Sequence, residues 1–167
     1  MKRALVLLGT LCLCVVIPGC SGDPREEAIN SVVNLMNTSA GAIKDITAEV
    51  KAATDKTVKN KAAFDLEEAT KATKKLQKIG EEAQKIKVNR VDVAPAASED
   101  EKKEFANRHR NAINSAYKLL LEEKKALNDE LTKAEAIDAD AKKKVEELRT
   151  KIREAEGPFE TLARQQG

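Results

Sequence analysis

Apolar residues repeat at seven-residue intervals along much of this chain. One series begins at Ile29 and continues through Met36, Ile43 and Val50. Such a repeat places a narrow apolar stripe along one side of an α-helix, and other helices have to cover that stripe. The composition agrees, because Ala, Lys, Glu and Leu are frequent and only 2% of the residues are aromatic. We therefore expect an all-α protein.

The apolar stripe is interrupted three times, and these interruptions divide the body of the chain into four expected helices. A helix begins at Asp23-Pro24, which is a typical N-cap and first-turn pair. The first break falls at 54–57, where turn and N-cap residues gather without Gly or Pro, so a kinked continuous helix is the alternative. The second is the linker 88–97, which contains Pro95 and ends at a capping box formed by Ser98 and Glu101. The expected helices cover approximately residues 24–53, 57–87, 98–136 and 139–156.

The third interruption is open to two interpretations. A seven-residue spacing runs from Ile113 to Leu162 without a break, which a single long helix would preserve. Asp138 and Asp140 resemble N-cap residues, and they favour a turn, with the last helix ending at Gly157-Pro158. We then expect an elongated up-down bundle of two long helical hairpins with coiled-coil-like packing. The predicted buried positions of its second half are Phe105, Ala112, Ile113, Ala116, Leu120, Leu127, Leu131, Ala134, Val145, Leu148, Ile152 and Ala155.

The first residues have the organisation of a secretory signal peptide. Lys2 and Arg3 precede an uncharged, mostly apolar stretch at 4–17, and Pro18, Gly19 and a polar segment follow. A membrane-spanning helix needs about 20 predominantly apolar residues, and this stretch is too short to provide them. We therefore expect residues 1–19 to be removed, which leaves residues 20–167 as the helical bundle.

The residues around the expected cleavage site, Ile17-Pro18-Gly19-Cys20, resemble the lipobox of bacterial lipoproteins. This resemblance implies cleavage between Gly19 and Cys20 and attachment of acyl chains to Cys20, which would then hold the protein on a membrane. Ser21 follows the cysteine, and in lipoproteins of bacteria with two membranes a residue other than Asp there leaves the protein free to travel to the outer membrane. The resemblance thus implies a lipid-anchored protein of the cell envelope, on the periplasmic side of the outer membrane rather than the inner membrane.

The body also looks similar to small uncharacterised helical envelope lipoproteins. The similarity rests on Met36-Asn37 and on the Ala-rich sequence Lys61-Ala62-Ala63. This group brings no known activity with it.

Charge and cysteine content narrow the functions further. Without residues 1–19, 28 basic side chains remain against 28 acidic ones, so no electrostatic attraction to nucleic acid is expected. Cys20 is then the only cysteine, which excludes an intramolecular disulfide and a thiolate metal site.

No residue pattern in the chain indicates catalysis. His109 is the only histidine, and between Arg108 and Arg110 we interpret it as an exposed surface residue. Adjacent carboxylates such as Glu122 and Glu123 do not face each other on a helix, and no glycine-rich phosphate loop is present. We therefore predict no enzyme and no catalytic, cofactor, metal or small-molecule site.

Three functional hypotheses remain. The favoured one is a lipid-anchored structural or interaction protein, which uses its coiled-coil faces to contact a second copy of itself, another envelope protein or the cell wall. The alternative is a periplasmic holdase-type chaperone with helical arms. The least favoured is a cell-envelope enzyme, because no site for one is visible.

Overall fold

A computed structural model describes residues 24–83 and 98–165 of the 167-residue chain. The expected signal peptide, Gly19, Cys20 and the expected linker 88–97 lie outside the described residues. Within them the chain forms four helices and contains no strand: α1 (Pro24–Asn60), α2 (Glu67–Ala83), α3 (Glu99–Glu135) and α4 (Ala139–Gln165). The predicted all-α fold is confirmed.

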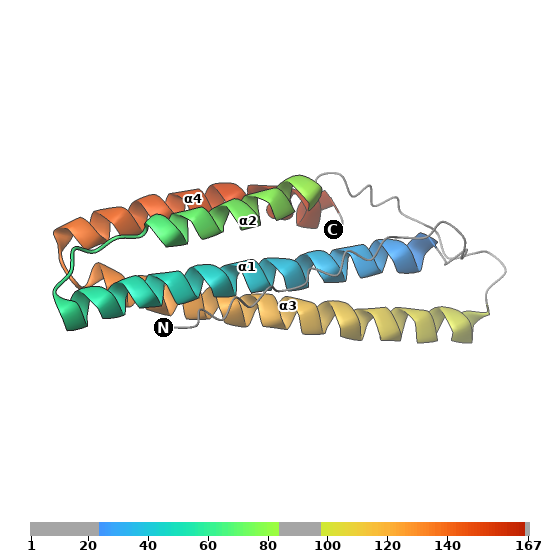
Figure 1. Cartoon of the computed structure of the whole chain (residues 1–167). Coiled ribbons are helices and arrows are strands. Elements are labelled where there is room, and N and C mark those ends of the chain that lie inside the picture. Colours follow the sequence, from blue (N-terminus) through green and yellow to red (C-terminus); the bar gives the residue numbers. More distant parts are fainter. Residues whose placement is uncertain (1–23, 84–97, 166–167) are drawn as a thin grey trace, which may run out of the picture.

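The four helices form two hairpins that lie side by side (Figure 1). α1 and α3 run in the same direction, α2 and α4 return, and both turns lie at one end of the bundle. α1 packs against α2 and α3, and α4 also packs against α2 and α3. Around the bundle the order is therefore α1, α2, α4, α3, and each hairpin contacts the other through helices that run parallel.

The helices differ in length, and this difference gives the bundle two sections. α1 and α3 have 37 residues each, whereas α2 has 17 and α4 has 27. At the turn end all four helices pack together, and at the other end α1 and α3 extend beyond their partners as a two-helix arm (Figure 1). At about 1.5 Å per residue, α1 is about 55 Å long.

The core lies in the four-helix section and consists mainly of aliphatic side chains. Its largest fully buried members are Ile43, Ile46 and Val50 of α1, Leu76 of α2, and Val145 and Leu148 of α4. α3 contributes Ala116, Leu127, Leu131 and Ala134, as predicted. Removing these surfaces from water is the main stabilising contribution, at about 25 cal/mol per Å² of apolar area.

Three predicted core positions of α3 are less buried than expected. Ala112 is exposed, and Ile113 and Leu120 are only partly buried. Leu120 still packs against the buried core cluster. The side chain of Phe105 lies outside the described part of the chain.

The predicted first turn at 54–57 is wrong. Thr54 is helical, and its hydroxyl donates a hydrogen bond to the carbonyl of Val50 (2.9 Å), which satisfies the side chain inside the helix. α1 ends seven residues later than predicted, and Lys61 follows it with a φ of 52°, the left-handed conformation that terminates many helices. The segment 61–66 then buries Phe64 and Leu66, which accounts for the phase change.

The turn between α3 and α4 is present, so residues 98–156 do not form one long helix. One carboxylate oxygen of Asp138 accepts a hydrogen bond from the backbone N–H of Ala141 at 2.7 Å. This is the expected N-cap interaction. The predicted end of the last helix at Gly157-Pro158 is wrong, because Gly157 does not adopt a positive φ and α4 continues to Gln165.

The start of α3 agrees with the sequence. The Ser98 hydroxyl accepts from the backbone N–H of Glu101, and the Glu101 carboxylate accepts from the backbone N–H of Ser98 at 2.8 Å. These hydrogen bonds, first from the backbone and then from the hydroxyl of Ser98, lower the pKa of Glu101 below its ordinary value. The carboxylate is therefore ionised at neutral pH, as the capping box requires.

Candidate interface between α3 and α4

α3 and α4 approach each other less closely than any other neighbouring pair of described helices. A groove of about 360 Å³ lies between them. The residues that line it are Lys124, Leu127, Asn128 and Leu131 of α3 and Arg149, Ile152, Arg153 and Glu156 of α4.

The bottom of the groove is apolar. Leu127, Leu131 and Ile152 line it, and each is at most 8% exposed because the other helices cover the opposite side. Leu127 and Leu131 are four residues apart on α3, so they occupy the same face. The apolar surface is thus a stripe that runs along the groove.

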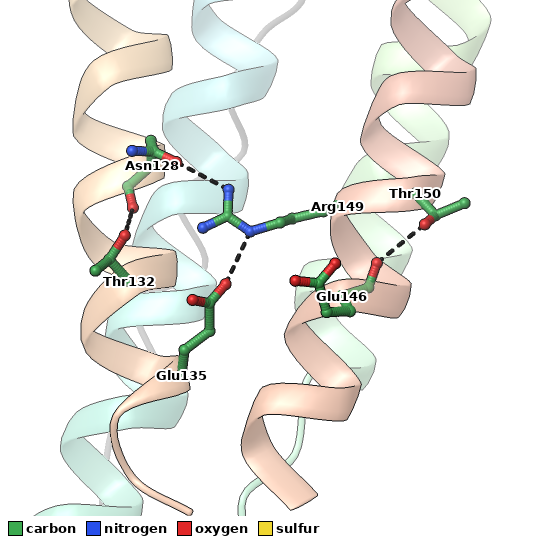
Figure 2. A network of polar contacts seen from close by, with 6 residues as sticks. All are labelled: Asn128, Thr132, Glu135, Glu146, Arg149 and Thr150. Carbon is green, nitrogen blue, oxygen red and sulfur yellow. Dashed lines mark hydrogen bonds and ion pairs between the residues drawn. The ribbon is translucent and has the colours of Figure 1, made fainter. Parts of the chain in front are cut away.

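Polar bridges rather than close apolar packing connect α3 and α4 across the groove. Figure 2 shows the guanidinium group of Arg149 reaching from α4 to two residues of α3. Its Nε donates to a carboxylate oxygen of Glu135 at 2.9 Å, and its Nη1 donates to the side-chain oxygen of Asn128 at 2.8 Å. The Lys124 ammonium forms a further ion pair with Glu156 at 3.0 Å. Charge-assisted hydrogen bonds of this kind fix the geometry of two helices at a modest gain in stability.

These pairs leave one cation of the groove available. Arg153 is exposed and forms no ion pair with any described residue. A guanidinium group binds a carboxylate with two parallel hydrogen bonds, and this makes it suitable for contacts with another protein. The groove therefore combines an apolar stripe, two internally paired cations and one accessible arginine.

Other grooves lie elsewhere on the bundle, and charged side chains dominate the two larger ones. The groove between α2 and α4 has about 430 Å³, and the one between α1 and α2 about 390 Å³. Hydrogen bonds to Glu67 and Glu68 raise the pKa of Lys71 above its ordinary value, and a hydrogen bond to Asp140 raises that of Lys144. A lysine that acts as a base or nucleophile needs a lowered pKa, so these two are charged structural groups.

His109 does not lie where the sequence predicted. Its side chain is 6% exposed, although Arg108 and Arg110 beside it are exposed. The spacing explains this result, because His109, Ile113 and Ala116 follow at intervals of four and three and share the face of α3 that points into the bundle. Within the described ranges, no three His, Cys, Asp or Glu side chains are arranged to hold a metal ion.

The predicted lipidation residue Cys20 and the cleavage position Gly19 lie outside the described residues, so the structure does not place them. None of the helices that the structure describes is long and apolar enough to cross a membrane. Sequence reasoning missed the groove, because it interpreted the charged residues of α3 and α4 as solvated faces. Arg149 and Glu135 can be paired only when the register of the hairpin is known.

Comparison with known proteins gives no match, since neither a family model, nor a curated protein, nor a solved structure is significantly similar to the chain. Function is therefore inferred from the residues and their geometry.

Proposed function

We propose that the chain is an exported lipoprotein whose helical bundle acts as a structural or protein-interaction module of the cell envelope. The lipobox-like residues Ile17-Pro18-Gly19-Cys20 support the anchor. The fold supports the interaction role, because an all-helical body with a groove that carries an accessible arginine suits protein contacts. We propose the periplasmic face of the outer membrane as its location.

The observation that carries the proposal is the position of the first helix relative to Cys20. α1 begins at Pro24, only four residues after the cysteine. Four extended residues span at most about 14 Å, so a lipid on Cys20 would hold the start of α1 close to the bilayer surface. The two turns, at the far end of α1, would then lie up to about 55 Å from it.

The anchoring part of the proposal is tested by replacing the cysteine. Cys20→Ala should abolish lipid attachment and processing by the lipoprotein pathway. Antibody detection after cell fractionation should then find the mutant chain at its unprocessed size. Mass spectrometry of the wild-type protein should give an N-terminal peptide that begins at Cys20 and carries acyl groups. Cys14→Ala is the matched control, because it changes a cysteine of the leader and should leave both results as in the wild type. An unmodified Cys20 in the mature wild-type chain would contradict the proposal.

The interaction part is tested by crosslinking in intact cells. A photoreactive residue in the groove, at Arg153, should give defined adducts with another protein chain. One in the groove between α1 and α2, at Ala48, is the control, and we expect it to give none. Equal labelling at both positions would argue against a specific interaction surface.

A further inference from the structure

The buried residues of α3 and α4 keep one periodic spacing through the turn that separates the two helices. Steps of four and three residues alternate along this series, as they do along one helix of a coiled coil. Asp138 is its one polar member, and its apolar members, each at most 8% exposed, are Leu127, Leu131, Ala134, Ala141, Val145, Leu148, Ile152 and Ala155. A hairpin does not require this spacing, because turns of many lengths connect antiparallel helices. The series would therefore form a continuous stripe if α3 and α4 were joined as one helix.

The turn at 136–138 contains little that prevents a continuous helix. It has no glycine or proline, and none of its residues has a positive φ. Ala136 already has a φ of −78° and a ψ of −5°, close to helical values. Four of the nine residues at 133–141 are alanine, the strongest helix former. The hydrogen bond from the backbone N–H of Ala141 to the Asp138 carboxylate is the interaction that favours the turn.

α4 depends on the first hairpin more than on α3, its neighbour in sequence. It packs more extensively against α2 than against α3. Polar bridges at Arg149 and Lys124 connect it to α3 across the groove. Because α4 is the last described helix, opening the single turn before it releases the helix, and no other connection between helices has to change. α4 can therefore leave its own bundle as a unit.

We propose that two copies of this chain exchange α4, so that the turn at 136–138 opens and α3 and α4 join into one continuous helix. The α4 of each copy then packs against α2 and α3 of the other copy, and the product is a domain-swapped dimer. Because the two copies have the same sequence, the exchanged α4 buries the same apolar residues and forms the same polar bridges as in the single chain. A helix of another protein would lack these matching residues, so the partner is a second copy.

The exchanged dimer and the single chain differ mainly at the turn. The contacts of α4 are the same in both forms, so the protein concentration and the conformation of residues 136–138 decide between them. In the continuous helix, the carbonyl groups at the end of α3 and the N–H groups at the start of α4 gain hydrogen-bond partners. The Asp138 carboxylate loses its role as a cap and lies on the apolar stripe, which disfavours the dimer. Asp138 therefore favours the single chain at low concentration.

Two substitutions at the turn should shift the balance in opposite directions. Residues 20–167 with Cys20→Ala, refolded from urea, should be monomeric at about 1 µM and partly dimeric at about 200 µM in analytical ultracentrifugation. Asp138→Leu removes the cap and completes the apolar stripe, so it should strengthen dimerisation at least about tenfold.

Ala139→Pro should abolish the dimer, because proline is accepted at the first position of a helix but breaks a continuous one. The chain already starts α1 in this way at Asp23-Pro24, so the variant should keep the thermal stability of the wild-type monomer. Asp140→Leu is the matched control for Asp138→Leu, since Asp140 is exposed and lies outside the stripe, and it should leave dimerisation unchanged. A wild type that stays monomeric at every concentration, or a dimer that persists in Ala139→Pro, would overturn the proposal.

Cysteine crosslinking distinguishes the exchange of α4 from association of two intact bundles. The Cys20→Ala chain without residues 1–19 contains no cysteine, and the side chains of Asn128 and Arg149 meet across α3 and α4 at 2.8 Å. Chains with Asn128→Cys refolded together with chains with Arg149→Cys should be joined by a short bifunctional maleimide, and peptide mass spectrometry should find the 128–149 adduct. The same mixture with Ala139→Pro in both chains should give none. A dimer without this adduct would consist of intact bundles and overturn the exchange, and neither measurement depends on the lipid anchor or on an envelope partner.

Discussion

The two turns of the bundle lie at the same end and connect antiparallel helices, yet different interactions hold them. The turn at 136–138 is short, and hydrogen bonds between residues close in sequence define it, including those from the backbone N–H groups of Ala136 to Lys133 and of Ile137 to Ala134. The turn at 61–66 is twice as long, and the burial of Phe64 and Leu66 holds it in place. The first kind of turn is encoded locally, whereas the second depends on the other hairpin.

Replacing the buried aromatic residue of the long turn should have the largest effect. Phe64 is 4% exposed, and Phe64→Ala should lower the free energy of unfolding by about 3–5 kcal/mol, because it removes a buried ring and leaves a cavity. Ile137→Ala is the matched change in the short turn, where the side chain is only partly buried. Urea denaturation should show a clearly smaller loss for Ile137→Ala, and equal losses would remove the distinction between the turns.

Removing the N-cap of α4 tests the local character of the short turn. Asp138→Ala should cost about 1 kcal/mol, because the backbone N–H of Ala141 loses its hydrogen-bond acceptor. Asp138→Asn retains an acceptor oxygen and should preserve most of the stability. The midpoint of urea unfolding measures both, and an Asn variant as unstable as the Ala variant would show that the hydrogen bond is not the cause.

A substitution in the long turn should increase stability. Lys61 has a φ of 52°, a conformation that costs a residue with a side chain about 1–2 kcal/mol and glycine almost nothing. Lys61→Gly should therefore stabilise the protein by about 0.5–1 kcal/mol, once the greater freedom of glycine in the unfolded chain is subtracted. Lys59→Gly, inside α1, should destabilise by a similar amount. Thermal unfolding of the two variants should shift in opposite directions, and a shared direction would contradict the assigned backbone conformation.

The smallest effect is expected for the polar contact between the long turn and the second hairpin. The Lys144 ammonium donates to the backbone carbonyl of Phe64 at 2.7 Å, so Lys144→Met should lower the unfolding temperature slightly and Lys143→Met should not. The hydrogen bond to Asp140 raises the pKa of Lys144. Its contribution is thus fully present at neutral pH and is lost only as pH rises through that raised pKa. The difference from the wild type should be the same between about pH 6 and 8, and a change within that range would exclude this contact as its source.

The sequence predicted interactions between residues that are close along the chain, and it did not predict those between distant residues. The capping box of Ser98 and Glu101 and the N-cap at Asp138 involve residues three positions apart, and both predictions were confirmed. Thr54 belongs to the residue types that begin helices, but its hydroxyl bonds back to Val50, and the break forms at Lys61 instead. One interaction of that turn is local, since a carboxylate oxygen of Asp65 accepts from the backbone N–H of Glu67 at 3.0 Å. The burial of Phe64 and the contact with a lysine eighty residues away leave no local pattern in the sequence.

The region around the α3–α4 groove could be predicted from the sequence only in part. The i,i+4 spacing of Tyr117 and Leu121 is visible in the sequence, but their exposure is not, because it depends on how far α4 stands from α3. The burial of His109 could have been predicted from its spacing to Ile113 and Ala116. Its charged neighbours led to the opposite interpretation.

The order of the helices around the bundle has a consequence for how the chain folds. α1 packs more extensively against α3 than against α2, its partner in the hairpin, although α2 and the following connection separate them in sequence. Contacts between distant segments slow folding, because a long stretch of chain has to close before they form. The side of α1 that faces α3 can therefore be buried only after α3 has been made, so the two hairpins should unfold as one cooperative unit.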